Sequence, residues 1–145
     1  MPTRTLAAIN RGVQMDLNDI RNGAADHDRG KWFNLSDPVT GDPTGIRLKI
    51  AGPDSQAQRR AELDMADRLA EMAGPDGRIS AANRETARLE TLASCVLAWE
   101  LKEDGEALQF NTANVLRFLR MAKWVEQQVD YYAGNHAAFA EGQDQ

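Results

Sequence analysis

The side chains best able to do chemistry in this 145-residue sequence are two histidines, His27 and His136. His27 lies between Asp26 and Asp28, and an imidazole flanked by two carboxylates could hold a metal ion. Neither histidine has a second His or Cys at ligand spacing along the chain, so the favoured interpretation is a solvent-exposed turn. The sequence therefore predicts no metal site.

Other catalytic patterns are missing as well. Ser55 and Ser94 have no histidine nearby in the sequence, and no glycine-rich loop precedes a Lys-Ser/Thr pair. The glycine turn around Gly105 lacks the ligand spacing of a calcium loop. The single cysteine, Cys95, stands among apolar residues and is interpreted as a small buried side chain rather than a nucleophile. We expect no catalytic residue and no cofactor; a small hydrolase or transferase is the least favoured class.

Composition limits the partners further. The net charge is −5, and an acidic chain is repelled by phosphate backbones, which argues against nucleic acid. The aromatic side chains are therefore expected in the core or in a protein-binding patch. No segment approaches the roughly 20 apolar residues of a membrane span, nor is there a secretion signal. A lone thiol fits a reducing compartment, so the expected location is the cytoplasm.

The elements that must position these residues begin after an N-terminal arm. Residues 1–30 are expected to be an arm that could be flexible, with a short helix over Thr5 to Met15 and a loop from Arg21 to Gly30. A β-hairpin is predicted at 31–50. Its second strand alternates Ile46, Leu48 and Ile50 with Arg47 and Lys49, which places the apolar residues on one face. Because two strands are marginal alone, the hairpin must lie on helices or pair with another chain.

Helices are predicted for most of the remaining chain. One runs from about 55 to 73, capped at Asp54-Ser55, with an apolar stripe of Ala61, Met65, Leu69 and Met72. The next starts near Ser80 and carries Leu89, Leu92, Val96 and Trp99 as the centre of the core.

After a turn at 102–106, Leu108 and Phe110 are expected to pack on Trp99, and Asn111 or Thr112 to cap the last helix. That helix presents one continuous face of Phe118, Ala122, Val125, Val129 and Tyr132, and leaves Trp124 and Tyr131 off the line.

Together these elements predict a mainly α fold with a small β-hairpin (α+β): three to four helices packed with an N-terminal hairpin. Gly134-Asn135 should end the last helix, and Phe139 should fold back onto the domain. The predicted organisation is an arm at 1–30, a helical domain at 31–140 and a disordered tail at 141–145.

The order of these parts from 31 to 139 resembles the tail assembly chaperone family of long-tailed bacteriophages. The resemblance covers about three quarters of the chain, while the first 30 residues match poorly. It is carried by an ordered set of motifs: Trp32-Phe33, Asp37-Pro38-Val39-Thr40-Gly41, Thr44 to Ile50, Gly52-Pro53-Asp54-Ser55, Ala98-Trp99, Asp104-Gly105-Glu106, Leu108 to Asn114, Trp124 to Val129, Asn135 and Phe139.

The resemblance implies a non-enzymatic assembly factor in the cytoplasm of the bacterial host. Such a chaperone would bind the phage tape measure protein, keep it soluble while the tail tube protein polymerises, and leave before the particle is complete. Adaptable apolar side chains suit a helical client, so the candidate protein-binding residues are Met65, Leu69, Met72, Trp124 and Tyr131. The alternative is a structural virion protein, a tail or head-completion component that forms a ring by self-association through strand addition at 31–50.

Overall fold

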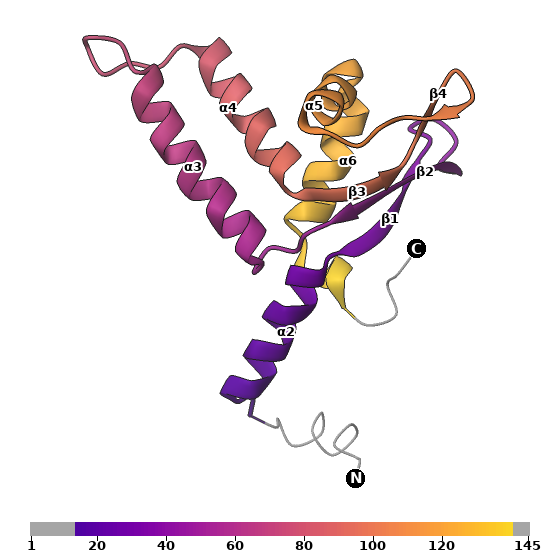
Figure 1. Ribbon diagram of the computed structural model, residues 1–145. Coiled ribbons are helices and arrows are strands. Elements are labelled where there is room, and N and C mark those ends of the chain that lie inside the picture. Colours follow the sequence, from indigo (N-terminus) through magenta and orange to yellow (C-terminus); the bar gives the residue numbers. More distant parts are fainter. Residues whose placement is uncertain (1–13, 141–145) are drawn as a thin grey trace.

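The computed structural model describes residues 14–140 and shows an α+β fold (Figure 1). Three antiparallel strands, β1 (Lys31–Ser36), β2 (Pro43–Ile50) and β3 (Val96–Glu100), form a sheet with β2 in the middle. Helices α4 (Ala81–Ser94), α5 (Thr112–Met121) and α6 (Lys123–Ala133) supply the apolar side chains that cover one face of the sheet. The predicted fold class is thus confirmed, with five α-helices in the described part of the chain rather than three or four.

The alternation in β2 works as predicted. Leu48 and Ile50 are fully buried, and Leu48 stands between Phe33 on β1 and Trp99 on β3 in the strand register. Arg47 and Lys49 occupy the opposite face, where the Arg47 guanidinium lies 5.0 Å from the centre of the Trp32 ring. The period of two therefore sets which face of the hairpin packs on the helices.

The third strand comes from a segment that was expected to be helical. The predicted helix from Ser80 to Trp99 is wrong beyond Ser94, because Val96–Glu100 pairs with β2. The backbone changes direction at Cys95, whose carbonyl accepts a hydrogen bond from the Ala51 amide at 2.8 Å. Branched and aromatic residues such as Val96 and Trp99 suit a strand, and the open edge of β2 needs a partner for its backbone groups.

The predicted loop from Arg21 to Gly30 is also wrong, because α2 (Leu17–Arg29) runs through it. Asp16 caps this helix by accepting from the amides of Asn18 and Asp19, and Asp19 reaches back to the Asp16 amide in a capping box. The cap offsets the helix-weakening effect of Gly23. Helix α2 points away from the body of the protein (Figure 1). The short helix expected from Thr5 lies almost entirely outside the described residues, as does the tail at 141–145.

Helix α3 (Gln56–Met72) follows the prediction closely. Ser55 is its N-cap and accepts a hydrogen bond from the Gln58 amide. The helix ends just before the turn that begins at Gly74, and α4 then runs back along it, packed against α3.

The last helical region is broken in two. At Ala122 the backbone is extended (φ −153°, ψ 142°), so α5 and α6 are separate helices and the predicted continuous face is wrong. Phe118, Val125 and Val129 nevertheless remain in the core, because each helix turns its own apolar side inward. Three smaller predictions are confirmed: Asn111 caps α5, Gly134 ends α6, and Phe139 of the 3-10 helix η1 (His136–Phe139) packs on Phe33 at 5.3 Å between ring centres.

Candidate functional site

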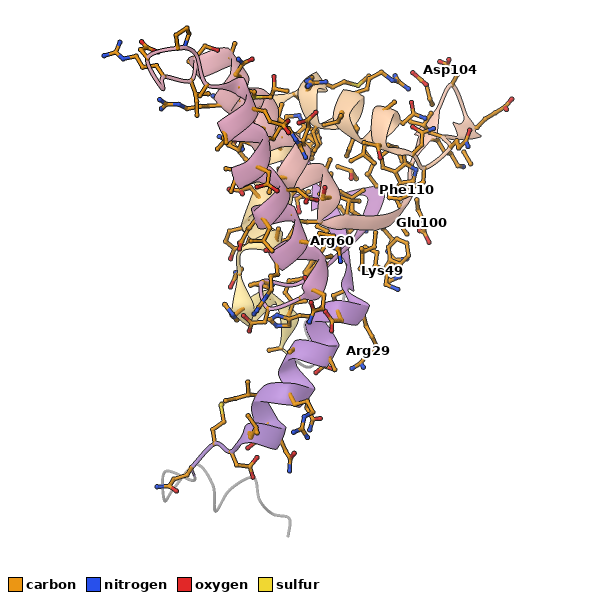
Figure 2. All side chains as sticks on the ribbon, turned by 60° about the vertical axis from the view of Figure 1, so that its left-hand side comes forward. Arg29, Lys49, Arg60, Glu100, Asp104 and Phe110 are labelled. Atoms are coloured by element: carbon orange, nitrogen blue, oxygen red, sulfur yellow. The ribbon has the colours of Figure 1, made fainter. Side chains whose placement is uncertain are left out.

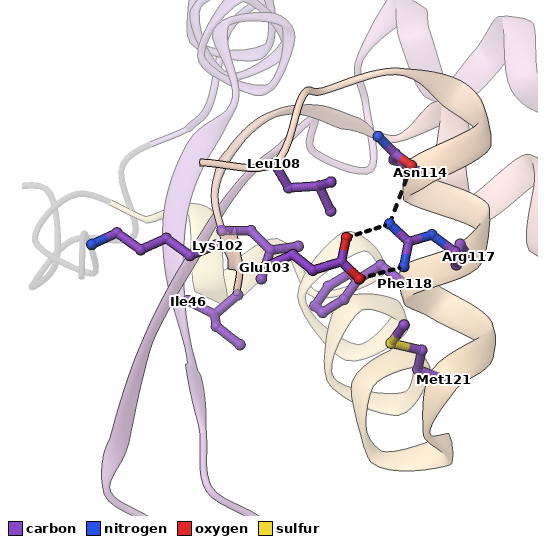
Figure 3. A pocket seen from close by; sticks show the side chains of 9 residues that line it. Ile46, Lys102, Glu103, Leu108, Asn114, Arg117, Phe118 and Met121 are labelled. Atoms are coloured by element: carbon purple, nitrogen blue, oxygen red, sulfur yellow. Dashed lines mark hydrogen bonds and ion pairs between the residues drawn. The ribbon is translucent and has the colours of Figure 1, made fainter. Parts of the chain in front are cut away.

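An apolar groove lies where a short hairpin, β4 (Lys102–Glu103) and β5 (Glu106–Ala107), meets helix α5 (Figure 3). We call it the hairpin groove. Its volume is about 230 Å³, and it is lined by Ile46, Leu101, Lys102, Glu103, Leu108, Asn114, Arg117, Phe118 and Met121. An adjoining hollow of about 570 Å³ shares Ile46, Leu101, Lys102 and Leu108 with it. The apolar surface thus continues past the base of the hairpin.

The groove is shaped by the tight turn of the hairpin and by Trp99. Asp104 and Gly105 both have positive φ (54° and 84°), as a two-residue hairpin turn requires, and Asp104 stands at the outer tip (Figure 2). Trp99 donates its ring N–H to the Leu108 carbonyl at 2.9 Å and meets Phe110 edge-on at 5.3 Å. The predicted packing of Phe110 on Trp99 is confirmed, although Trp99 is on a strand, and Leu108 contacts Trp99 through its backbone carbonyl.

A charged pair closes one side of the groove. Arg117 on α5 donates two hydrogen bonds of 3.0 Å to the carboxylate of Glu103 on β4 (Figure 3). This pairing lowers the pKa of Glu103 and raises the pKa of Arg117. The two-pronged geometry fixes the hairpin against α5, so a charged pair stands beside apolar lining residues such as Ile46 and Leu108.

Two large apolar side chains remain open to solvent at this end of the molecule. Met121, on the lining of the hairpin groove, is 63% exposed, and Phe110, beside Trp99, is 40% exposed. Exposed Met and Phe next to an apolar hollow are typical of surfaces that bind protein segments. The arrangement can accept an apolar side chain, and its charged pair joins the hairpin to α5.

The five predicted protein-binding residues do not line the hairpin groove. Met65, Leu69 and Met72 are half-buried on α3, and Met65 borders a separate cavity of about 150 Å³ that also includes Leu92 and Ala133. Trp124 is half-buried against the core, whereas Tyr131 is 62% exposed. The sequence signal for the groove was present in the apolar residues on both sides of the turn at 102–106, but Leu108 was expected only to pack on Trp99.

The two histidines, distant in sequence, lie together in the structure. His27 is 6% exposed, so the predicted solvent-exposed turn is wrong. Its Nδ1 lies 3.8 Å from Oδ2 of Asp54, and Nε2 of His136 lies 3.1 Å from the same oxygen. Within residues 14–140 these three residues are the group whose donor atoms come close enough to suggest a metal ion. No sequence motif indicated this cluster, because its three residues come from separate elements: α2, the loop before α3, and η1.

The hydrogen bonds at this cluster argue against metal binding. The amide of Asp54 donates to Nδ1 of His27 at 2.9 Å, and that nitrogen has a single lone pair, which a metal would need. Ser55 and Ser94 do not form a nucleophile–base pair with these histidines: Ser55 Oγ caps α3, and Ser94 Oγ donates to the Glu90 carbonyl. The arrangement serves to connect three elements of the fold.

Cys95 is buried as predicted, at 5% exposure. Burial raises the pKa of its thiol to about 12, with smaller contributions from Glu62 and Asp130. A thiol with so high a pKa is not a nucleophile near neutral pH.

No family model, curated protein or solved structure matches this chain. In the described range, every helix is too short or too polar to cross a lipid bilayer.

Proposed function

We propose that this protein is a non-enzymatic tail assembly chaperone of a bacteriophage, which binds the tape measure protein in the host cytoplasm and keeps it soluble. The proposal rests on the ordered motifs between Trp32 and Phe139 and on the hairpin groove, which is the observation that carries it. A tape measure protein is a long amphipathic helical chain whose apolar stripes would otherwise aggregate. A groove with a mainly apolar lining and a charged pair on one side suits one apolar side chain of such a helix.

The groove also suits transient binding. Its volume of about 230 Å³ accommodates only a few side-chain groups, and small contacts of this kind dissociate readily. A client that must be released before the particle is complete needs contacts that are numerous along its length and individually weak. The tail tube protein is a further partner under this proposal, and self-association of the chaperone on the client would provide the repeated contacts.

Co-expression with the tape measure protein tests the proposal. We expect the wild-type protein to keep the tape measure soluble and to co-purify with it. Met121→Glu places a charge at the groove and should abolish both effects. Leu63→Glu is the matched control, because Leu63 on α3 is equally exposed, at 63%, and does not line the groove. The proposal is wrong if the Met121→Glu variant still keeps the tape measure protein soluble and co-purifies with it, or if the wild-type protein never binds it.

The alternative is a structural virion protein that forms a ring by strand addition. The outer strand of the predicted hairpin is β1, and both backbone groups of Ser36 at its end are already bonded to the Gln128 side chain. Strand addition at this point would have to displace Gln128, which favours the chaperone. Mass spectrometry of purified particles separates the two functions, since a stoichiometric amount of this protein in finished virions would establish the structural role.

A further inference from the structure

Helix α2 is attached to the body of the protein through its last turn. Three hydrogen bonds make the joint: the Gly52 amide donates to the His27 carbonyl at 3.0 Å, the Asp54 amide to His27 Nδ1 at 2.9 Å, and the Gln56 amide to the Asp28 carboxylate at 2.7 Å. The other end of the helix extends away from the body (Figures 1 and 2), and Leu17 there is 68% exposed. The direction of α2 therefore depends on the surroundings of His27.

His27 is held in a neutral form by these surroundings. Because its Nδ1 accepts the Asp54 amide, this nitrogen carries no proton and the ring proton must be on Nε2. The ring is packed against Gly52, where a Cβ would lie 2.8 Å from Nδ1, and against Phe139 at 5.0 Å between ring centres. Burial is the largest influence on the pKa of His27 and lowers it.

A proton on Nδ1 is incompatible with this joint. It would place two N–H groups against each other at the 2.9 Å that now separates Nδ1 from the Asp54 amide. The Asp54 carboxylate offers an acceptor 3.8 Å away, but that oxygen is now 3.1 Å from Nε2 of His136. The charged groups that face His27 are Asp28 from α2, Asp54 from the loop before α3, and His136 from η1; the carboxylates favour the proton and His136 opposes it.

We propose that protonation of His27 controls the direction of α2 relative to the body of the protein. With neutral His27 the Asp54 amide is bonded to Nδ1 and α2 is fixed at the start of α3. When Nδ1 of His27 takes up a proton, it can no longer accept the Asp54 amide. It donates instead to the Asp54 carboxylate, which replaces the amide as its partner. The joint loosens and α2 changes its direction relative to the body. Two alternative bonding patterns around one side chain are the two-state element that a pH switch requires.

NMR on the 145-residue chain gives a direct test. Between pH 8 and pH 5, the imidazole nitrogens of His27 should show an unprotonated Nδ1 at high pH and a midpoint below 6.5, the ordinary value. The amide resonance of Asp54 should move with the same midpoint. An Asp54 amide that does not follow the His27 titration overturns the proposal, and so does a neutral His27 with its proton on Nδ1.

The movement itself can be measured between spin labels on cysteines placed at Asn22 in α2 and Gln127 in α6, both exposed. Cys95 is buried and stays unlabelled. We expect one narrow distance distribution at pH 8 and a broad or shifted one at pH 5. A distribution that stays narrow and unshifted while NMR shows His27 protonated overturns the proposal.

Two matched variants identify the responsible group. In His27→Asn the amide oxygen can still accept the Asp54 N–H but cannot titrate, so the distribution should stay narrow at both pH values. His136→Asn removes the exposed histidine and should still broaden at pH 5. If the distance distribution of His27→Asn broadens at pH 5 as much as that of the wild type, a group other than His27 is responsible. The same conclusion follows if the distribution of His136→Asn no longer broadens. If His27→Asn does not fold, the coincidence of the two wild-type NMR midpoints decides the question.

Discussion

The side chain of Gln128 on α6 hydrogen-bonds both backbone groups of Ser36 at the end of β1. Its Oε1 accepts from the Ser36 amide at 2.9 Å, and its Nε2 donates to the Ser36 carbonyl at 2.8 Å. One amide side chain thus takes the place of a neighbouring strand at an edge that would otherwise be open to pairing.

Replacing Gln128 by Ala should destabilise the protein by about 1–3 kcal/mol, because two half-buried backbone groups lose their partners. Gln128→Glu should also be destabilising, since a carboxylate cannot donate to the Ser36 carbonyl. Urea denaturation measures both effects. Gln127→Ala on the exposed side of the same helix is the control, and equal stability of the two alanine variants would contradict the prediction.

Truncation of Leu119 should be among the most damaging changes in the core. Leu119 is 0% exposed on α5, and removing a side chain of this size leaves a cavity that costs about 2–5 kcal/mol. Leu63→Ala changes the same residue type at 63% exposure and should cost less than about 0.5 kcal/mol. Thermal unfolding measures the stability of both variants. A similar loss of stability in both would show that α5 does not contribute to the core as described.

Two glycine-to-alanine changes should act in opposite directions. At Gly52 a Cβ would lie 2.7 Å from the Cβ of His27, so Gly52→Ala should destabilise the protein by about 1–3 kcal/mol through overpacking. At Gly23, inside α2, a Cβ meets nothing within 4 Å, and Gly23→Ala should stabilise the helix by about 0.5–1 kcal/mol. Circular dichroism and urea denaturation measure these effects. The prediction fails if Gly52→Ala is as stable as the wild type.

The thiol of Cys95 should be unreactive in the folded protein. Its pKa of about 12 leaves almost no thiolate at pH 8, and its 5% exposure blocks reagents. A disulfide reagent such as Ellman's should therefore label it only when the protein is unfolded in urea. Ser94→Cys places a second thiol at the exposed neighbouring position and should react within minutes in the native state. Rapid labelling of wild-type Cys95 would contradict its burial.

Acid should reduce stability through His27. Folding lowers the pKa of His27. As the pH falls below 6.5, this side chain is therefore protonated to a greater extent in the unfolded chain than in the folded one. The free energy of unfolding should therefore fall as the pH drops through 6.5, and this contribution should level off below the native pKa. Urea denaturation at several pH values measures the slope, and His27→Asn should remove this part of it. An unchanged slope in the variant would show that other groups are responsible.

Much of the local structure followed from the sequence. The caps were predicted to within one residue, at Asp54-Ser55 and at Asn111 or Thr112, because a capping side-chain oxygen binds the free amides of the next two or three residues. The alternation from Ile46 to Ile50 gave the correct buried face, because side chains on a strand must point to alternate sides.

Two of the errors occurred where the local sequence signals pointed to more than one structure. Leu89, Leu92, Val96 and Trp99 fit a helical period, but Val96 and Trp99 form a strand, since β2 offered backbone hydrogen bonds that no local rule can anticipate. In α2, the asparagine and glycine at 22–23 indicated a loop, but the segment is a helix that begins with a capping box at Asp16.

The sequence by itself determined the α+β class, most helix starts, the burial of Cys95 and the contact of Phe110 with Trp99, because these depend on neighbours along the chain. The tertiary structure alone decided the third strand, the place of Ile46 beside the hairpin groove and the meeting of His27, Asp54 and His136. Each of these joins segments separated by dozens of residues, and such contacts form only when the whole chain finds the packing that satisfies its buried polar groups.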